Sequence, residues 1–150
     1  MTTLKETLQA DVVKHLKARS TNELTTVRNV LGEIERKELA GKERVELSDV
    51  EVIAVLKKQA ASRREVAANY ESLGRPEDAA QEISEAVIIE AYLPAALTEA
   101  DVEAIVVDAI AQTGAESMRQ MGDVMKIVTP AVAGRFDGSA VAALVKAKLA

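Results

Sequence analysis

The chain has 150 residues, a formal net charge of −5 and no cysteine. This length suits one domain or two small ones, and the lack of cysteine excludes disulfides and thiolate metal sites. The negative charge disfavours indiscriminate nucleic-acid binding, which depends on many phosphate contacts. The three aromatic residues are too few for a protein that reads single-stranded bases by stacking.

Charge is unevenly distributed along the chain. Lys and Arg outnumber Asp and Glu in residues 1–76, and the reverse holds in residues 77–150. The first twenty residues carry several charges and lack the apolar core of a signal peptide. No apolar run approaches the roughly 20 residues that cross a bilayer. We therefore expect a soluble, cytoplasmic protein that makes no membrane contact.

Helix signals begin near the N-terminus and continue without a strand-like alternation. Apolar residues at every fourth position, from Leu4 to Leu16, predict a first helix that ends near Arg19. The segment Ser20–Glu23 has the pattern of a capping box. It predicts the start of a second helix, which closes at Gly41.

Two more helices are predicted before the joint that begins at Pro94. Ser48–Glu51 forms another capping box, and the helix it starts should stop at Gly74, a typical left-handed residue. Pro76 suits the first turn of a fourth helix, where its missing amide hydrogen costs little. That helix should end before Pro94, because the residue preceding proline avoids the helical region.

Three further helices follow Pro94. Thr98 with Asp101 predicts the start of the fifth helix, which should run to Gly114. A sixth is expected from Ser117 to a break near Pro130, and Asp137 should cap a seventh. We predict an all-α fold: an N-terminal four-helix domain in residues 1–93, a linker in residues 94–97, and a C-terminal three-helix bundle in residues 98–150.

Catalytic signatures are not recognisable in the sequence. The single histidine, His15, has no partners at metal-ligand or triad spacing, so we interpret it as a solvated helix residue. Glycine-rich nucleotide-binding motifs are missing as well. Gly134–Gly138 could be an anion-binding loop, but helix punctuation explains it better. We therefore expect no catalytic residue, no cofactor and no metal.

Charged residues lie on the apolar faces of three predicted helices. Arg63 falls on the apolar side of the third helix, and Glu38 and Glu90 fall on the apolar sides of the second and fourth. A buried guanidinium must be paired, because its desolvation otherwise costs several kcal/mol. We predict a structural ion pair between Arg63 and either Glu90 or Glu38.

A basic set occupies the opposite side of the third helix. It comprises Lys57, Lys58 and Arg64, joined from the earlier helices by Lys14, Lys17, Arg19 and Arg28. Two interpretations remain open: a patch that follows phosphates, or an ordinary solvated surface diluted by nearby Glu65 and Glu71.

Small residues and methionines mark the stretch from Thr113 to Gly138. Met118, Met121 and Met125 form a helical stripe that suits either core packing or an adaptable partner surface. Gly122 adjoins this stripe, and a glycine within a helix costs about 1 kcal/mol relative to alanine. We interpret it as allowing close approach by another helix or by an RNA backbone.

This stretch, with the tail AVAALVKAKLA and the upstream EAYLP, resembles the GatB/YqeY family over nearly the whole chain. The family comprises small free-standing proteins and the tail of the B subunit of the amidotransferases that act on Asp-tRNA(Asn) and Glu-tRNA(Gln). The resemblance implies recognition of tRNA or of a tRNA-handling enzyme by the C-terminal helices. The residues that we carry over, with neighbouring bases, are Arg119, Gly122, Lys126, Gly134, Arg135, Lys146 and Lys148.

Three functions remain open at this stage. The chain could be an accessory protein whose C-terminal helices bind tRNA or an aminoacyl-tRNA-handling enzyme, which is the interpretation we favour. It could instead be a helical protein–protein adaptor without an RNA role. It could also take part in glutamine-dependent amide transfer, a carbon–nitrogen ligase reaction. That reaction needs an amidase nucleophile and a phosphate-activating site, both of which partner enzymes would have to supply.

Overall fold

The computed structural model describes residues 2–150, and every regular element in that range is a helix. It confirms the predicted all-α class, with four helices followed by three. The α-helices are α1 (Leu4–Ala18), α2 (Thr21–Glu38), α3 (Asp49–Ser72), α4 (Pro76–Glu90), α5 (Glu99–Thr113), α6 (Met121–Val132) and α7 (Gly138–Leu149). A single 3₁₀ turn, η1 (Met118–Gln120), precedes α6.

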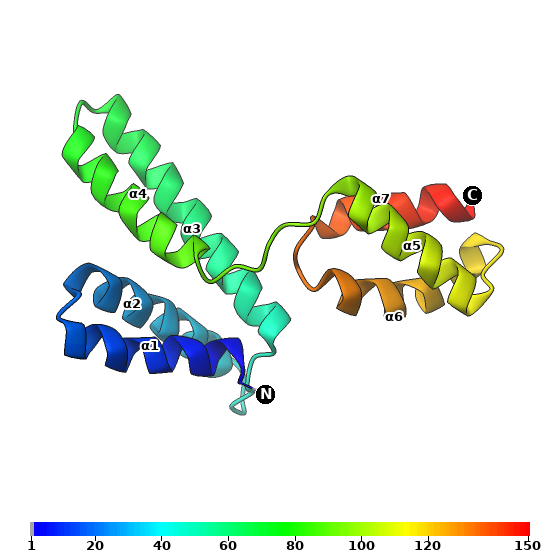
Figure 1. Ribbon diagram of the computed structural model, residues 1–150, viewed down its shortest axis with the longest axis horizontal. Helices are drawn as coiled ribbons and strands as arrows, with labels where there is room; N and C mark the ends of the chain where they lie inside the picture. The colour runs from blue at the N-terminus through cyan, green and yellow to red at the C-terminus, as the bar shows by residue number, and fades with distance from the viewer. Residues whose placement is uncertain (1) are drawn as a thin grey trace. The chain divides into compact units, whose positions relative to one another are not determined.

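The chain divides into two compact units, Met1–Leu93 and Pro94–Ala150. In the first unit, α1 and α2 form one helical hairpin, and α3 and α4 form another (Figure 1). Their shared core is aliphatic and includes Leu8, Ile34 and Leu56, each completely buried. Among residues 2–150, no helix is long and apolar enough to cross a membrane.

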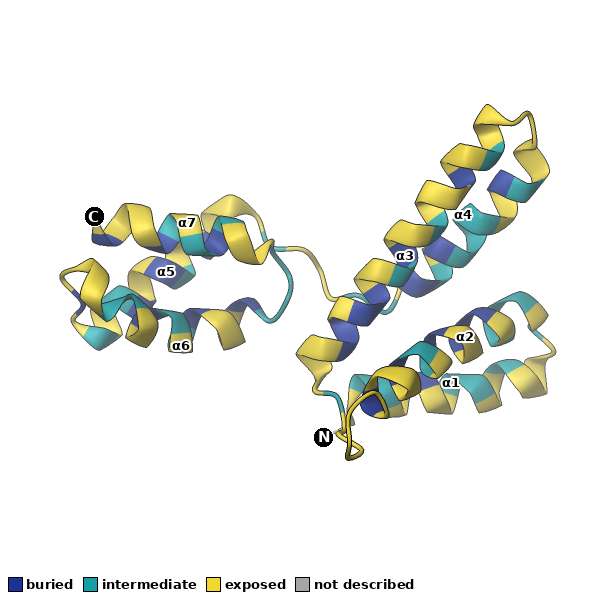
Figure 2. Ribbon diagram, turned by 180° about the vertical axis from the view of Figure 1, so that it is seen from behind, coloured by how far each residue is buried: buried dark blue, intermediate teal, exposed yellow. Residues whose placement is uncertain are grey.

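The second unit packs α5, α6 and α7 around a core composed mainly of valines. Val102, Val106, Val124, Val128 and Val145 are all fully buried. Figure 2 shows buried stretches alternating with exposed ones along α5, α6 and α7. The outer faces of α5, α6 and α7 are therefore available for contacts with other molecules.

Most of the predicted helix ends are observed. The capping boxes at Ser48 and Thr98 both form, because each hydroxyl accepts a bond from the amide three residues later. Asp137 caps α7 in the same way. Gly74 and Gly114 adopt φ angles of 70° and 65°, the left-handed conformation expected beyond a helix end.

One predicted cap does not form, and two predicted helix ends are displaced. Ser20 precedes α2 but makes no side-chain cap, because its ψ of 79° departs from the extended geometry of a capping residue. The second helix ends at Glu38, before Gly41. Helix α6 continues through Pro130 to Val132, where burial of Val132 and the bond from the Ala133 amide to the Thr129 carbonyl complete the last turn.

Candidate interface on helix α6

Helix α6 presents a small, partly basic surface on its solvent side. Gly122 and Lys126, four residues apart, lie on one exposed face of α6, and Arg119 is exposed in the η1 turn just before it. Val124, Val128 and Val132 bury the other face. Just upstream, the Gln120 side chain accepts a bond from the Ser117 amide, which holds the η1 turn.

Gly122 lies open to solvent. A β-carbon built at this position would meet no atom within 4 Å. Packing inside the C-terminal unit therefore does not require glycine here. Its absence of a side chain leaves the α6 backbone accessible between Arg119 and Lys126.

The predicted methionine stripe is divided between two environments. Met121 and Met125 are half-buried and pack against the C-terminal core. Met118 has 43% of its surface exposed. Core packing thus accounts for two of these methionines, and Met118 remains an apolar surface residue beside Arg119.

Neither Arg119 nor Lys126 forms an ion pair with any of residues 2–150. Asp123, an exposed carboxylate directly after Gly122, reduces the positive electrostatic potential around Arg119 and Lys126. We refer to Arg119, Gly122 and Lys126 as the α6 face. It can offer two cations to phosphates, with open backbone between them.

Arg135 serves the fold instead of joining the α6 face. Its guanidinium donates to the carbonyls of Ala131 at 2.8 Å and Val132 at 3.2 Å, two acceptors that the end of α6 leaves without helical partners. A cation here also complements the helix dipole. Gly134 next to it has a φ of 75°, as expected for helix punctuation.

Of the two lysines of α7, one forms an ion pair and the other is exposed. Lys148 lies 2.8 Å from a carboxylate oxygen of Glu103 and thereby joins α7 to α5. This pairing lowers the pKa of Glu103, because a neighbouring ammonium favours the ionised carboxylate. Lys146 is exposed on the last turn of α7. Of the C-terminal basic residues expected at the interface, Arg119, Lys126 and Lys146 therefore keep their charges available.

The predicted partners of Arg63 are wrong. Arg63 lies 3.3 Å from Glu85 and bonds Gln59 at 3.0 Å, whereas Glu90 pairs with Arg64. Helices α3 and α4 form a hairpin about Gly74, and Arg63 and Glu85 lie at equal sequence distances from it. Glu85 is therefore directly across the hairpin from Arg63, and Glu90 lies further along α4.

Glu38 pairs with a residue of α1, whereas the predicted partner, Arg63, belongs to α3. Its carboxylate accepts bonds from Lys5 of α1 at 2.5 and 3.0 Å, with Arg44 at 3.9 Å. The pKa of Glu38 is lowered chiefly by the bond from Lys5, against the opposing effect of burial. All three residues of the predicted ion pair thus take part in ion pairs, but with other partners.

The basic set on α3 is partly neutralised. Arg64 donates two bonds to Glu90, at 2.6 and 3.0 Å, and this lowers the pKa of Glu90. Lys57 and Lys58 are exposed on the same helix. Because Arg64 is paired with Glu90, it is not a candidate for contact with phosphates. Such contact stays a hypothesis for the two lysines.

His15 is half-buried, which the sequence did not indicate. It lines a hollow of about 320 Å³ with Asp11, Glu23 and Tyr92, among others. The Tyr92 hydroxyl donates to Asp11 at 2.5 Å, and the Tyr92 pKa is raised, first by burial and then by Asp11. A link between residues so far apart in sequence leaves no local signal.

Potential metal ligands do not cluster in residues 2–150. That range contains no group of three or more His, Cys, Asp or Glu side chains placed to hold a metal ion. Several acidic side chains serve caps or ion pairs, such as Asp101 with Thr98 and Glu38 with Lys5.

Comparison with known protein families gives one match. The family model described as Yqey-like protein matches residues 5–149, which is almost the entire chain. A search among curated proteins finds no match. The family match confirms the resemblance noted in the sequence.

Proposed function

Because the chain belongs to the Yqey-like protein family, we propose that it is an accessory protein that binds tRNA through the α6 face. The observation that carries this proposal is the exposure of Arg119 in η1 and of Gly122 and Lys126 at the start of α6, close together along the chain. Two cations seven residues apart in the sequence can contact phosphates of one RNA strand, and the open backbone at Gly122 lets the RNA approach.

The proposed binding uses a few cations that contact the RNA backbone at one place on the protein. Acidic residues outnumber basic ones in residues 77–150, which include the α6 face, so RNA contacts there must come from a few cations. Lys146 is a further candidate cation, while Arg135 and Lys148 act inside the unit. Scarce aromatic residues favour recognition of the RNA backbone over stacking on its bases.

A link to glutamine-dependent amide transfer follows from the resemblance to the amidotransferase B subunit. Such a reaction needs a nucleophile to release ammonia and a site that activates the acyl acceptor. We assign neither to a residue of this chain. In the proposed role the protein presents tRNA to cytoplasmic enzymes that contain both sites. Residues 94–97 serve as the linker between its two domains.

A protein-binding role is the second candidate. The observation that favours it is Met118, an apolar side chain 43% exposed beside the α6 face. Methionine adapts well to varied partner surfaces. In this alternative, the same face binds an aminoacyl-tRNA-handling enzyme and makes no contact with RNA.

Charge reversal at Lys126 separates these two functions. We expect Lys126→Glu to weaken binding of deacylated tRNA by about 10-fold, because one phosphate contact becomes a repulsion. Lys42→Glu is the matched control, since Lys42 is an exposed loop residue of the first unit. Equal affinities of the two variants would rule out the α6 face as the RNA site.

A further inference from the structure

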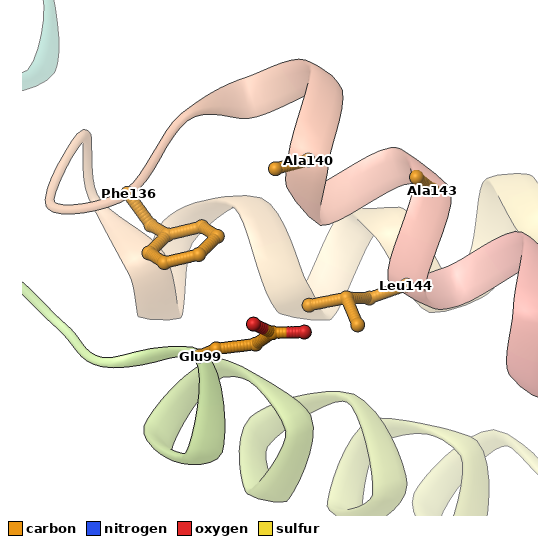
Figure 3. Close-up of a pocket in the computed structure, with 5 residues that line it drawn as sticks. All are labelled: Glu99, Phe136, Ala140, Ala143 and Leu144. Carbon is orange, nitrogen blue, oxygen red and sulfur yellow. The ribbon is translucent and has the colours of Figure 1, made fainter.

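A shallow apolar hollow opens between the start of α5 and the first half of α7 (Figure 3). It has a volume of about 290 Å³ and is lined by Phe136, Ala140, Ala143, Leu144 and Glu99. All five residues belong to the C-terminal unit. The volume lies near the lower limit for small-molecule pockets and suits a single inserted side chain.

Two of the lining residues pack against the core, and two others have small side chains. Phe136, the chain's one phenylalanine, and Leu144 both pack against the C-terminal core. On α7, Ala140 and Ala143 present only methyl groups above them. Small side chains at these two positions therefore leave the apolar surface of Phe136 and Leu144 accessible.

Glu99 brings a negative charge to this apolar opening. Figure 3 shows its carboxylate directed toward Leu144. Within residues 2–150, no cation forms an ion pair with Glu99. The hollow thus combines an apolar floor with an unneutralised carboxylate.

One turn further along α5, the carboxylate that faces α7 is paired with a cation. Glu103 lies one turn after Glu99 on α5 and pairs with Lys148 of α7 at 2.8 Å. Leu144 lies one turn before Lys148 and gives Glu99 an apolar neighbour in place of a cation. Helix α7 therefore supplies a cation to the second carboxylate and none to the first.

We propose that this hollow, the α5–α7 hollow, binds a helix of a partner protein. The helix inserts one apolar side chain against Phe136 and Leu144, and a Lys or Arg one turn away pairs with Glu99. Charge complementarity supports this occupant, because Glu99 attracts a cation and repels the phosphates of RNA. Presentation of an apolar anchor on a helix face is a common mode of peptide recognition. The proposal does not depend on tRNA binding by the α6 face.

A titration followed by NMR tests the proposal with the full chain and defined probes. Three alanine-based helical peptides would carry Leu and Arg one turn apart, Leu and Glu in the same places, or Ala and Arg. We expect the Leu–Arg peptide to shift the amide signals of Glu99, Phe136 and Leu144. The other two peptides should bind several-fold more weakly.

Two variants make the test specific. Glu99→Gln should weaken the Leu–Arg peptide by about 2–5-fold, as expected for an exposed ion pair. Ala143→Lys should abolish binding, because the lysine stem covers the hollow and its ammonium neutralises Glu99. Both positions are exposed, so circular dichroism should show unchanged helix content.

Several outcomes would overturn the proposal. They are equal binding of the Leu–Arg and Leu–Glu peptides, signal shifts confined to other helices, or Leu–Arg affinity unchanged by Ala143→Lys. A dimer of the unmodified chain that Ala143→Lys dissociates in sedimentation would identify a second copy as the occupant instead. Glu99→Gln should leave tRNA affinity within about 2-fold, so failure here is distinguishable from failure of the α6 face.

Discussion

Lys5 of α1 and Glu38 of α2 form an ion pair in which the carboxylate side chain is completely shielded from solvent. The lysine side chain retains 16% exposure, so its ammonium reaches the surface while its partner does not. The pair joins the first turn of the chain to the end of α2. It holds the first hairpin closed at the end where the loop to α3 begins.

Removing the Glu38 charge should destabilise the N-terminal unit. We expect Glu38→Gln to cost about 3 kcal/mol near neutral pH, because it leaves Lys5 without its buried partner. Thermal unfolding measures the loss. Glu33→Gln, which removes an exposed pair with Arg36, should cost much less.

The same pair predicts a dependence on pH. The folded-state pKa of Glu38 is lowered, so its stabilisation is complete above the unfolded value of about 4.3 and disappears as pH falls through the folded value. The stability difference between the unmodified chain and Glu38→Gln should therefore shrink below about pH 4. A difference that is constant from pH 7 to pH 3 would show that the charge is not responsible.

Adjacent arginines of α3 should respond differently to substitution. Arg63→Met removes a cation of which 14% is exposed, and it leaves Glu85 close to Glu82. We expect a loss of roughly 2 kcal/mol in urea unfolding. Arg64→Met should change stability little, because the Arg64 side chain is 50% exposed. Equal losses would contradict the observed pairing.

The hydroxyl of Tyr92 should stabilise the junction of α4 with α1. Tyr92→Phe removes its bond to Asp11 and should cost about 1.5 kcal/mol, typical of a hydrogen bond to a charged group. Tyr70→Phe is the matched control. Tyr70 contacts Arg75 through its ring, at 4.9 Å from the ring centroid, so loss of its hydroxyl should have little effect.

Gly122 predicts opposite effects on stability and binding. Gly122→Ala should raise stability by up to about 1 kcal/mol, because alanine favours the helix and the added methyl meets nothing. It should also weaken tRNA binding if the RNA backbone approaches there. Gly32→Ala in α2 is the control, since its site is equally open and should give the stability gain alone. Unchanged tRNA affinity in both variants would remove the role assigned to Gly122.

Local signals made the helices predictable from the sequence. The partners in the ion pairs between helices could not be predicted in this way. The capping residues Ser48 and Thr98 act within one turn, so the sequence contains the whole interaction. The partner of Arg63 depends on the register of α3 against α4, which no single helix specifies. The α5–α7 hollow joins Glu99 to Phe136 and Leu144, and only the packed unit brings them together.

The salt dependence of tRNA affinity tests the central claim most directly. If two or three cations around the α6 face contact phosphates, affinity should fall about 10–40-fold between 50 and 200 mM salt. Lys126→Glu should make that dependence shallower. Absence of tRNA binding at 50 mM salt would contradict the account, as would a salt dependence that Lys126→Glu leaves unchanged.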